Sequence, residues 1–122
     1  KKAVSALEID LEIMPEEIDW NFMNELKKME PFGEGNPEPI FLMKNMIIAD
    51  LRICGNGNKH LKLSLRSENK SPKIFDSIGF GFGNKFPDLK NEDKIDIVFN
   101  LKEDSWNGNK KIQFNLIDLK KN

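Results

Sequence analysis

The sequence has few of the residues from which catalytic and metal sites are usually built. Its 122 residues include one cysteine, Cys54, and one histidine, His60. A single cysteine excludes an internal disulfide and fits a reducing compartment, so we predict a cytoplasmic location. One histidine is too few to complete a metal site with Cys54 or to offer a choice of bases to a nucleophile. We therefore expect no catalytic residue, no metal site and no cofactor in this chain.

Long apolar runs and targeting signals are also missing. No run approaches the roughly 18 apolar residues of a membrane span, so we expect no membrane partner. No signal-peptide pattern opens the chain. It begins at Lys1 and enters a strand pattern almost at once, which suggests a piece of a larger protein. Hydrophobic residues make up 39% and charged residues 32%, as in soluble globular domains.

The whole chain has no excess of basic residues, but its middle part does. The net charge is −1. Residues 1–38 carry four basic and ten acidic side chains, residues 39–85 eight and three, and residues 86–122 seven of each. Charges segregated in this way can form a basic face on an acidic protein. A nucleic-acid partner is therefore not excluded by the total.

Alternation of apolar and polar residues predicts a mainly β fold. Residues 7–13 read as a half-buried strand, and Pro15 opens a helix that Pro31 ends. Asn-Gly turns join the first two and the last two of the strands that follow. These features predict a five-stranded OB-fold barrel preceded by a short β-strand and an α-helix, with an SH3-like barrel or short sandwich as the alternative. The five strands are expected at residues 40–54, 60–66, 73–80, 94–102 and 111–119.

The stretch PFGEGNPEP, residues 31–39, indicates a stiff connector rather than a phosphate loop. A phosphate loop offers backbone N–H groups at the start of a helix, but these glycines follow a helix and the prolines lack N–H groups. We expect the glycines to allow positive φ, the prolines to impose extended geometry, and the phenylalanine to anchor the turn in a core. The predicted joint consists of Phe32, Gly33, Gly35, Asn36, Pro37 and Pro39.

The strand at residues 60–66 is the most informative segment for function. Its three leucines point one way, so His60, Lys62 and Arg66 point the other, with same-face residues about 7 Å apart. Single-stranded nucleic acid requires a cationic groove interleaved with aromatic platforms. The alternative is an ordinary strand surface, with the tryptophan of the last hairpin packing over that hairpin. The candidate binding residues are Lys59, His60, Lys62, Arg66, Lys73, Phe75, Phe82, Trp106, Lys110 and Lys111.

This interface also depends on which phenylalanine side chains point outward. We expect Lys73 and Phe75 to share one face of their strand, with Ile74 on the other. In Gly79-Phe-Gly-Phe-Gly83 the spacing is wrong for a dinucleotide fingerprint, so a bend in the strand is expected. Phe80 is expected to point inward, and Phe82 is the candidate exposed aromatic.

Several segments in order resemble the C-terminal OB domain of the RecJ family, the bacterial single-strand-specific DNA exonucleases. They are Leu26–Pro39 with Phe41, HLKLSL at 60–65, Ser77–Phe80, and Trp106-Asn-Gly108 followed by Gln113 and Ile117-Asp118. Ser77 stands where the family often has alanine. The resemblance implies a parent enzyme that degrades single-stranded DNA from its 5′ end with Mg²⁺ or Mn²⁺ held by Asp-His-His motifs. Those motifs are absent here, so we expect this chain to be non-catalytic.

The resemblance also implies an organisation and a role. Residues 1–30 are expected to be a strand and helix of the preceding domain or a bridge, residues 31–39 the connector, and residues 40–122 the OB domain. The leading hypothesis is a module that holds single-stranded DNA for the nuclease core of the same parent chain in DNA repair and recombination. The alternative is an interaction module that docks the catalytic domains or a single-strand-binding protein.

Overall fold

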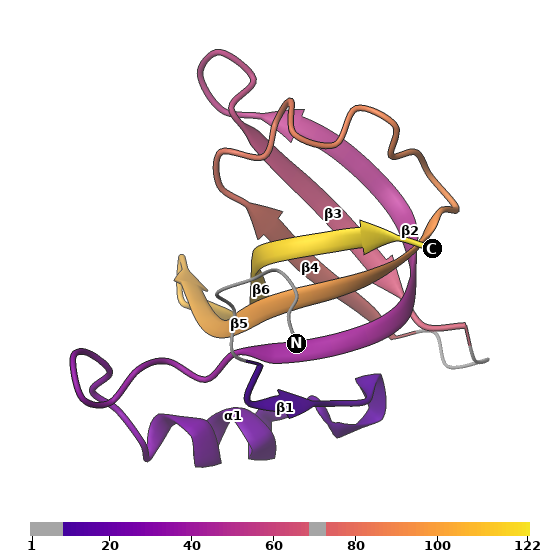
Figure 1. Ribbon diagram of the computed structural model, residues 1–122. Helices are drawn as coiled ribbons and strands as arrows, with labels where there is room; N and C mark the ends of the chain where they lie inside the picture. Colours follow the sequence, from indigo (N-terminus) through magenta and orange to yellow (C-terminus); the bar gives the residue numbers. More distant parts are fainter. Residues whose placement is uncertain (1–8, 69–72) are drawn as a thin grey trace.

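The computed structural model describes residues 9–68 and 73–122, and Figure 1 shows their arrangement. Leu7 of the predicted first strand lies outside the described residues. A short strand, a 3₁₀ turn and one helix come first, and five longer strands follow. The elements are β1 (Leu11–Glu12), η1 (Pro15–Glu17), α1 (Trp20–Lys27), β2 (Phe41–Cys54), β3 (His60–Arg66), β4 (Ile74–Gly79), β5 (Lys94–Trp106) and β6 (Asn109–Lys121).

The five long strands close into a barrel. Their order is β2-β3-β4-β6-β5, and β5 pairs back to β2. β4 and β6 pair in parallel, whereas the other neighbours in the barrel are antiparallel. β1 adds in parallel to the start of β2, with Leu11 opposite Phe41. The predicted five-stranded OB-fold barrel, with a strand and a helix before it, is confirmed.

β2 bends so that it can pair with two different neighbours. Its first half pairs with β5 and its second half with β3, and the ladder is irregular between Met43 and Met46. Asn45 has a φ of 60° at this irregularity, and its N–H donates to the Asp96 carboxylate over 3.0 Å. An asparagine tolerates this left-handed conformation better than most residues. This irregularity lets one strand take part in two ladders of the barrel.

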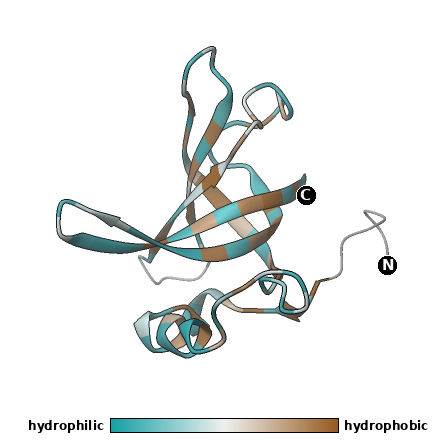
Figure 2. Ribbon diagram, turned by 90° about the vertical axis from the view of Figure 1, so that its left-hand side faces the viewer, coloured by the Kyte–Doolittle hydropathy of each residue, from teal (hydrophilic) through white to brown (hydrophobic). Residues whose placement is uncertain are grey.

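The N-terminal segment shares its core with the barrel. Ile13, Ile18, Met23 and Leu26 are buried in the same cluster as the inward residues of the strands. Figure 2 shows how apolar and polar residues alternate along the strands, and how the β5–β6 hairpin projects from the barrel with a largely hydrophilic tip. The first elements therefore cover part of the barrel rather than standing apart from it.

Two expectations for the N-terminal segment are wrong. The helix does not open at Pro15, which starts only the 3₁₀ turn η1. It opens after Asp19, whose carboxylate accepts the Phe22 N–H over 2.8 Å as an N-cap. The predicted apolar strand face is also wrong, because Ile9 and Leu11 are exposed and only Ile13 is buried.

The connector at residues 31–39 is held by its own hydrogen bonds and by β5. The Asn36 amide donates to the Met29 and Pro31 carbonyls, each over 2.8 Å. Asn100 of β5 donates to the Pro39 carbonyl over 2.8 Å, and Lys102 forms an ion pair with Glu38. These contacts fix both ends of the connector against the barrel.

The glycines and the phenylalanine of the connector differ partly from expectation. Gly35 has a φ of +83°, as predicted, but Gly33 does not adopt positive φ. Gly33 instead exchanges two backbone hydrogen bonds with Asn36, over 2.8 and 3.0 Å. Phe32 is half-buried beside Leu101 and is not part of the core cluster, so its predicted anchoring in a core is wrong.

Candidate nucleic-acid interface

The outer surface of β3 and β4 is the centre of the predicted interface. We define the β3–β4 face as the outward residues of these two strands: His60, Lys62, Ser64, Arg66, Ile74, Asp76 and Ile78. The three leucines of β3 are fully inside the barrel, which confirms the predicted orientation of this strand. Strand pairing sets Lys62 between Arg52 of β2 and Ile78 of β4. Basic side chains of two neighbouring strands therefore lie side by side.

Ion pairs with residues from distant parts of the chain neutralise part of this face. Arg66 pairs with Glu92 over 2.9 Å, and Lys111 of β6 pairs with Asp76 over 3.3 Å. Within residues 9–68 and 73–122, Lys59 and Lys62 form no ion pair. The cations that stay unpaired therefore lie toward the β2–β3 hairpin, while the opposite end of the strand carries paired charges.

A shallow hollow of about 150 Å³ lies at the middle of the face. Asp50, Arg52, Lys62, Asp76 and Lys111 line it. Ser77 lies beneath it, inside the barrel, and its hydroxyl donates to the Leu63 carbonyl over 2.9 Å. This hydrogen bond satisfies the buried hydroxyl at the position where the family often has alanine. The hollow combines ammonium and guanidinium donors with carboxylate acceptors.

The predicted outward orientation of Phe75 is wrong. Phe75 is 5% exposed and stacks on Phe114 inside the barrel, with 5.0 Å between ring centroids. Its partner in the ladder is Leu65, and directly paired residues of antiparallel strands share a face. Ile74 is consequently the outward residue, at 51% exposure. Phe75 therefore cannot offer a platform to a ligand on the outer surface.

The roles expected for Phe80 and Phe82 are exchanged in the structure. Phe80 is 57% exposed, and its ring meets that of His60 edge to face at 5.3 Å. Phe82 is half-buried against the core and contacts the ring of Phe86. Gly81, with a φ of +79°, lies between them and breaks the alternation of a strand. The exposed aromatic near the β2–β3 hairpin is therefore Phe80, which the sequence pattern had placed inside.

The connection between β4 and β5 supports the β2–β3 hairpin. The Gly83 N–H donates to the Lys59 carbonyl over 2.8 Å. The Gly81 N–H donates to Nδ1 of His60 over 3.0 Å. A Cβ atom at Gly83 would overlap the Asn58 carbonyl oxygen, so glycine allows the two loops to touch. The β4–β5 connection therefore holds the backbone of Lys59 in place.

The β5–β6 hairpin presents the other predicted residues. Asn107 and Gly108 form its turn, both with positive φ, as the Asn-Gly pair predicts. Trp106 is 70% exposed at the end of β5. Lys110 lies 3.8 Å from Glu103, and the hydrogen bond and ion pair with Lys27 of α1 hold the pKa of Glu103 below its ordinary value against the effect of its burial. Glu103 therefore joins this hairpin to α1.

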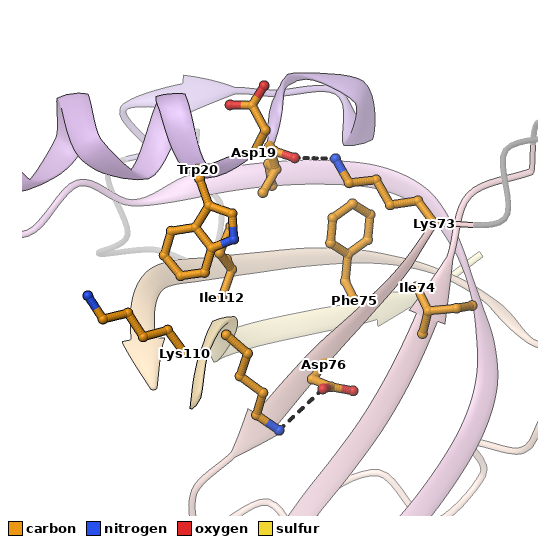
Figure 3. A pocket seen from close by; sticks show the side chains of 10 residues that line it. Asp19, Trp20, Lys73, Ile74, Phe75, Asp76, Lys110 and Ile112 are labelled. Atoms are coloured by element: carbon orange, nitrogen blue, oxygen red, sulfur yellow. Dashed lines mark hydrogen bonds and ion pairs between the residues drawn. The ribbon is translucent and has the colours of Figure 1, made fainter. Parts of the chain in front are cut away.

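A second depression brings together three of the predicted lysines with a residue that the sequence pattern did not indicate. Lys73, Lys110 and Lys111 line a pocket of about 370 Å³ between α1 and the barrel, drawn in Figure 3. Trp20, the first residue of α1, also lines it and is 40% exposed. The Asp19 cap, a recognisable start signal, was the indication that Trp20 begins the helix.

The described residues offer neither a cluster of metal ligands nor a membrane-spanning helix. In the part of the chain that the structure describes, no three residues of the histidine, cysteine, aspartate and glutamate types gather as a possible ion site. The one α-helix among the described residues is neither long nor apolar enough to cross a membrane.

Comparison with known proteins gives consistent matches. The family model of the RecJ OB domain matches residues 9–118. The single-stranded-DNA-specific exonuclease RecJ of Bacillus subtilis is 31% identical over 111 residues, which are 91% of this chain and 14% of that protein. The RecJ exonuclease of Thermus thermophilus is 32% identical over 97 residues, or 80% of this chain and 13% of its own length. The chain therefore spans a small part of the relatives that it matches.

Solved structures agree with the sequence matches. Crystal structures of Thermus thermophilus RecJ with Mg²⁺ and with Mn²⁺ both align with a TM-score of 0.59, at 29% and 30% identity. Each alignment covers 83% of this chain and 14% of that one. The mitochondrial single-stranded DNA binding protein Rim1 of Saccharomyces cerevisiae aligns with a TM-score of 0.53 at 11% identity, over 69% of this chain and 95% of its own. The likeness to Rim1 is one of fold.

Proposed function

This chain belongs to the RecJ OB domain family, and from that membership we propose that it binds single-stranded DNA along the β3–β4 face. The observation that carries the proposal is the cationic row on β3, where Lys62 is unpaired among the described residues and Arg66 follows on the same side. Ammonium and guanidinium groups contact phosphates regardless of base, so the binding is independent of sequence. Exposed aromatic rings near the two hairpins, Phe80 and Trp106, add stacking surfaces.

We also propose the role of this domain in the parent protein. The relatives are named as single-stranded-DNA-specific exonucleases, and this chain covers 14% of the Bacillus protein. The domain would hold the strand while a nuclease core elsewhere in the parent removes nucleotides from the 5′ end, in the cytoplasm and in the service of DNA repair and recombination. The Mg²⁺ and Mn²⁺ complexes of the Thermus protein support a metal-dependent core. Among the described residues, no three histidine, cysteine, aspartate or glutamate side chains gather where they could hold such a metal.

A salt titration tests the binding face. If three to five phosphates are neutralised, log affinity should fall with log salt at a slope of about −2 to −3.5, or about −0.7 per phosphate. Lys62→Ala with Arg66→Ala should weaken binding to all sequences and flatten the slope by about 0.7 for each phosphate that is no longer neutralised. Lys28→Ala with Lys120→Ala is the matched control, because both lysines are exposed outside this face. A folded Lys62/Arg66 variant with unchanged affinity and slope would remove the face from the proposal.

An interaction module is the second candidate function, and one surface favours it. A mostly apolar groove of about 510 Å³ runs along α1 and the start of β2. Leu11 and Met29, 47% and 52% exposed, line this groove together with Phe22 and Phe41, and contiguous apolar surface of this kind marks interaction sites. The groove would dock the catalytic part of the parent or a single-strand-binding protein. Leu11→Ser with Met29→Ser should then weaken that association and leave oligonucleotide affinity unchanged.

A further inference from the structure

The α1–barrel pocket, lined by Trp20, Lys73 and Lys110 among others, combines one large aromatic ring with cations. Figure 3 shows the Trp20 indole reaching from α1 toward Ile112 and Lys110 of β6, with Phe75 across the pocket. The apolar wall consists of Ile74, Phe75 and Ile112. The pocket measures about 370 Å³, at the small end of the ~300–1000 Å³ typical of ligand pockets. The space suits one flat ring system rather than a long ligand.

This pocket continues the β3–β4 face. Asp76 and Lys111 line both the α1–barrel pocket and the hollow at the middle of the face. These two side chains form an ion pair over 3.3 Å. A DNA strand that lies over Lys62 would therefore reach the α1–barrel pocket next, because the two depressions adjoin each other.

We propose that the α1–barrel pocket receives one base of the single strand, stacked on Trp20. This inference rests on the proposed function of the β3–β4 face and extends it by one nucleotide site. Tryptophan offers the largest aromatic face, and stacking tolerates any base. The flanking phosphate meets Lys110, whose side chain is 63% exposed and whose ammonium lies 3.8 Å from a Glu103 carboxylate oxygen.

The contacts of Lys73 fix its place at the pocket edge. Its ammonium donates to the Ile18 carbonyl and lies 5.4 Å from the centroid of the Phe75 ring. A lysine has three N–H donors, so the bond to Ile18 leaves two for a ligand. The side chain is thereby held before any strand arrives, which lowers the entropy cost of binding. Lys73 and Lys110 give the pocket two cations. Lys110 has the Glu103 carboxylate at 3.8 Å, and within residues 9–68 and 73–122 Lys73 forms no ion pair.

An acidic, apolar peptide is the competing occupant, since it also combines negative charge with apolar groups. One observation favours a base instead. The pocket adjoins the hollow of the β3–β4 face through shared residues, as a site for the next nucleotide of a strand would.

Affinities for oligonucleotides of increasing length test the proposal. Trp20→Ala should weaken binding about 5- to 150-fold, because one stacked base contributes about that factor. The loss should appear only for oligonucleotides long enough to reach the pocket, with little change in salt slope. Met29→Ala is the control, since Met29 is an exposed apolar side chain beyond the other end of α1. Wild-type affinity of Trp20→Ala at every length would overturn the pocket and leave the β3–β4 face standing.

A second measurement keeps Trp20 in place, in case its replacement unfolds the chain. In a Trp106→Phe variant, Trp20 is the one remaining tryptophan. Its fluorescence should be quenched on titration with poly-dT, at the lengths at which the Trp20→Ala loss appears. Quenching by an acidic, apolar peptide but not by poly-dT would overturn the proposal in favour of the peptide. Binding of poly-dT without quenching would also overturn it, whereas no binding of poly-dT by the wild type would overturn the proposed function as well.

Discussion

The two hairpins beside the β3–β4 face differ in how they are held. The β2–β3 hairpin is supported from outside, because Gly83 and Gly81 donate to Lys59 and His60. For the tip of the β5–β6 hairpin, residues 106–109, the described residues supply no hydrogen bond from outside the hairpin. The first hairpin therefore presents preformed contacts, while the second leaves Trp106 free to adjust to a ligand. One interface thus contains a fixed edge and an adaptable edge.

The largest expected effect comes from removing the support of the fixed edge. In Gly83→Ala the new Cβ meets backbone atoms of Asn58 and Lys59, which cannot rotate away. We expect the free energy of unfolding to fall by about 3 kcal/mol, as for overpacked sites. Urea denaturation measures it.

A control in the β2–β3 hairpin itself separates steric overlap from backbone strain. Gly57 has a φ of +72° but faces open space, so Gly57→Ala should cost only about 1–2 kcal/mol. Equal losses of stability for the two variants would mean that the β4–β5 connection does not support the hairpin.

An intermediate effect is expected at the aromatic rings of the two edges. Trp106→Ala should weaken oligonucleotide binding by about 1–3 kcal/mol without lowering the melting temperature, because its indole is exposed. Phe80→Ala should weaken binding and also lower the melting temperature slightly, because Phe80 contacts His60. Fluorescence anisotropy with labelled oligonucleotides, together with melting curves, measures both. If only Phe80→Ala weakens binding, the strand uses the fixed edge alone.

The smallest effect concerns the stem of the adaptable hairpin and depends on pH. The pKa of Glu103 is lowered in the folded state, so its pairing stabilises the fold above the ordinary value of 4.5 and is lost as the pH falls through the lowered pKa. Glu103→Gln should therefore melt below the wild type at pH 7, and the two melting temperatures should converge below pH 4. A constant difference down to pH 3 would show that the charge of Glu103 is not the cause.

The sequence was sufficient for the topology and for β3. Two Asn-Gly turns and five strand segments predicted the barrel, and the unbroken alternation of β3 gave its inner and outer faces correctly. Such local signals work when each apolar side chain of a strand lies on the buried side. They therefore located Lys62 and Arg66 on the outer surface.

β4 shows why the rest of the face could not be predicted. Its inward residues are Phe75, Ser77 and Gly79, and its two isoleucines point outward, so hydropathy gives the wrong side. The small inward residues leave room for the Phe82 ring, which a side chain at Gly79 would overlap. That space is filled by Phe82, which lies beyond the end of β4. The residue pattern within β4 therefore does not indicate which of its sides is buried.

The charge of the face also depends on the fold. Counting residues along the chain isolated a basic middle third, but Glu92 comes from the β4–β5 connection and pairs with Arg66 across 26 positions of sequence. Lys111 reaches Asp76 from β6 in the same way. The separation of basic from acidic residues along the sequence is therefore smaller in the folded structure. Similarly, Trp20 and Lys110 line one pocket only because the start of α1 lies over the barrel beside β6.

The core that α1 shares with the barrel has a mechanical consequence. Ile18, Met23 and Leu26 are packed among strand residues, and the connector between α1 and β2 is fastened to β5 by Asn100 and Lys102. Tension on a strand held at the barrel would therefore reach α1 through close-packed side chains, which resist deformation, rather than through slack backbone. If the barrel binds the strand as proposed, a pull on that strand would tilt α1 and the barrel together as one rigid unit.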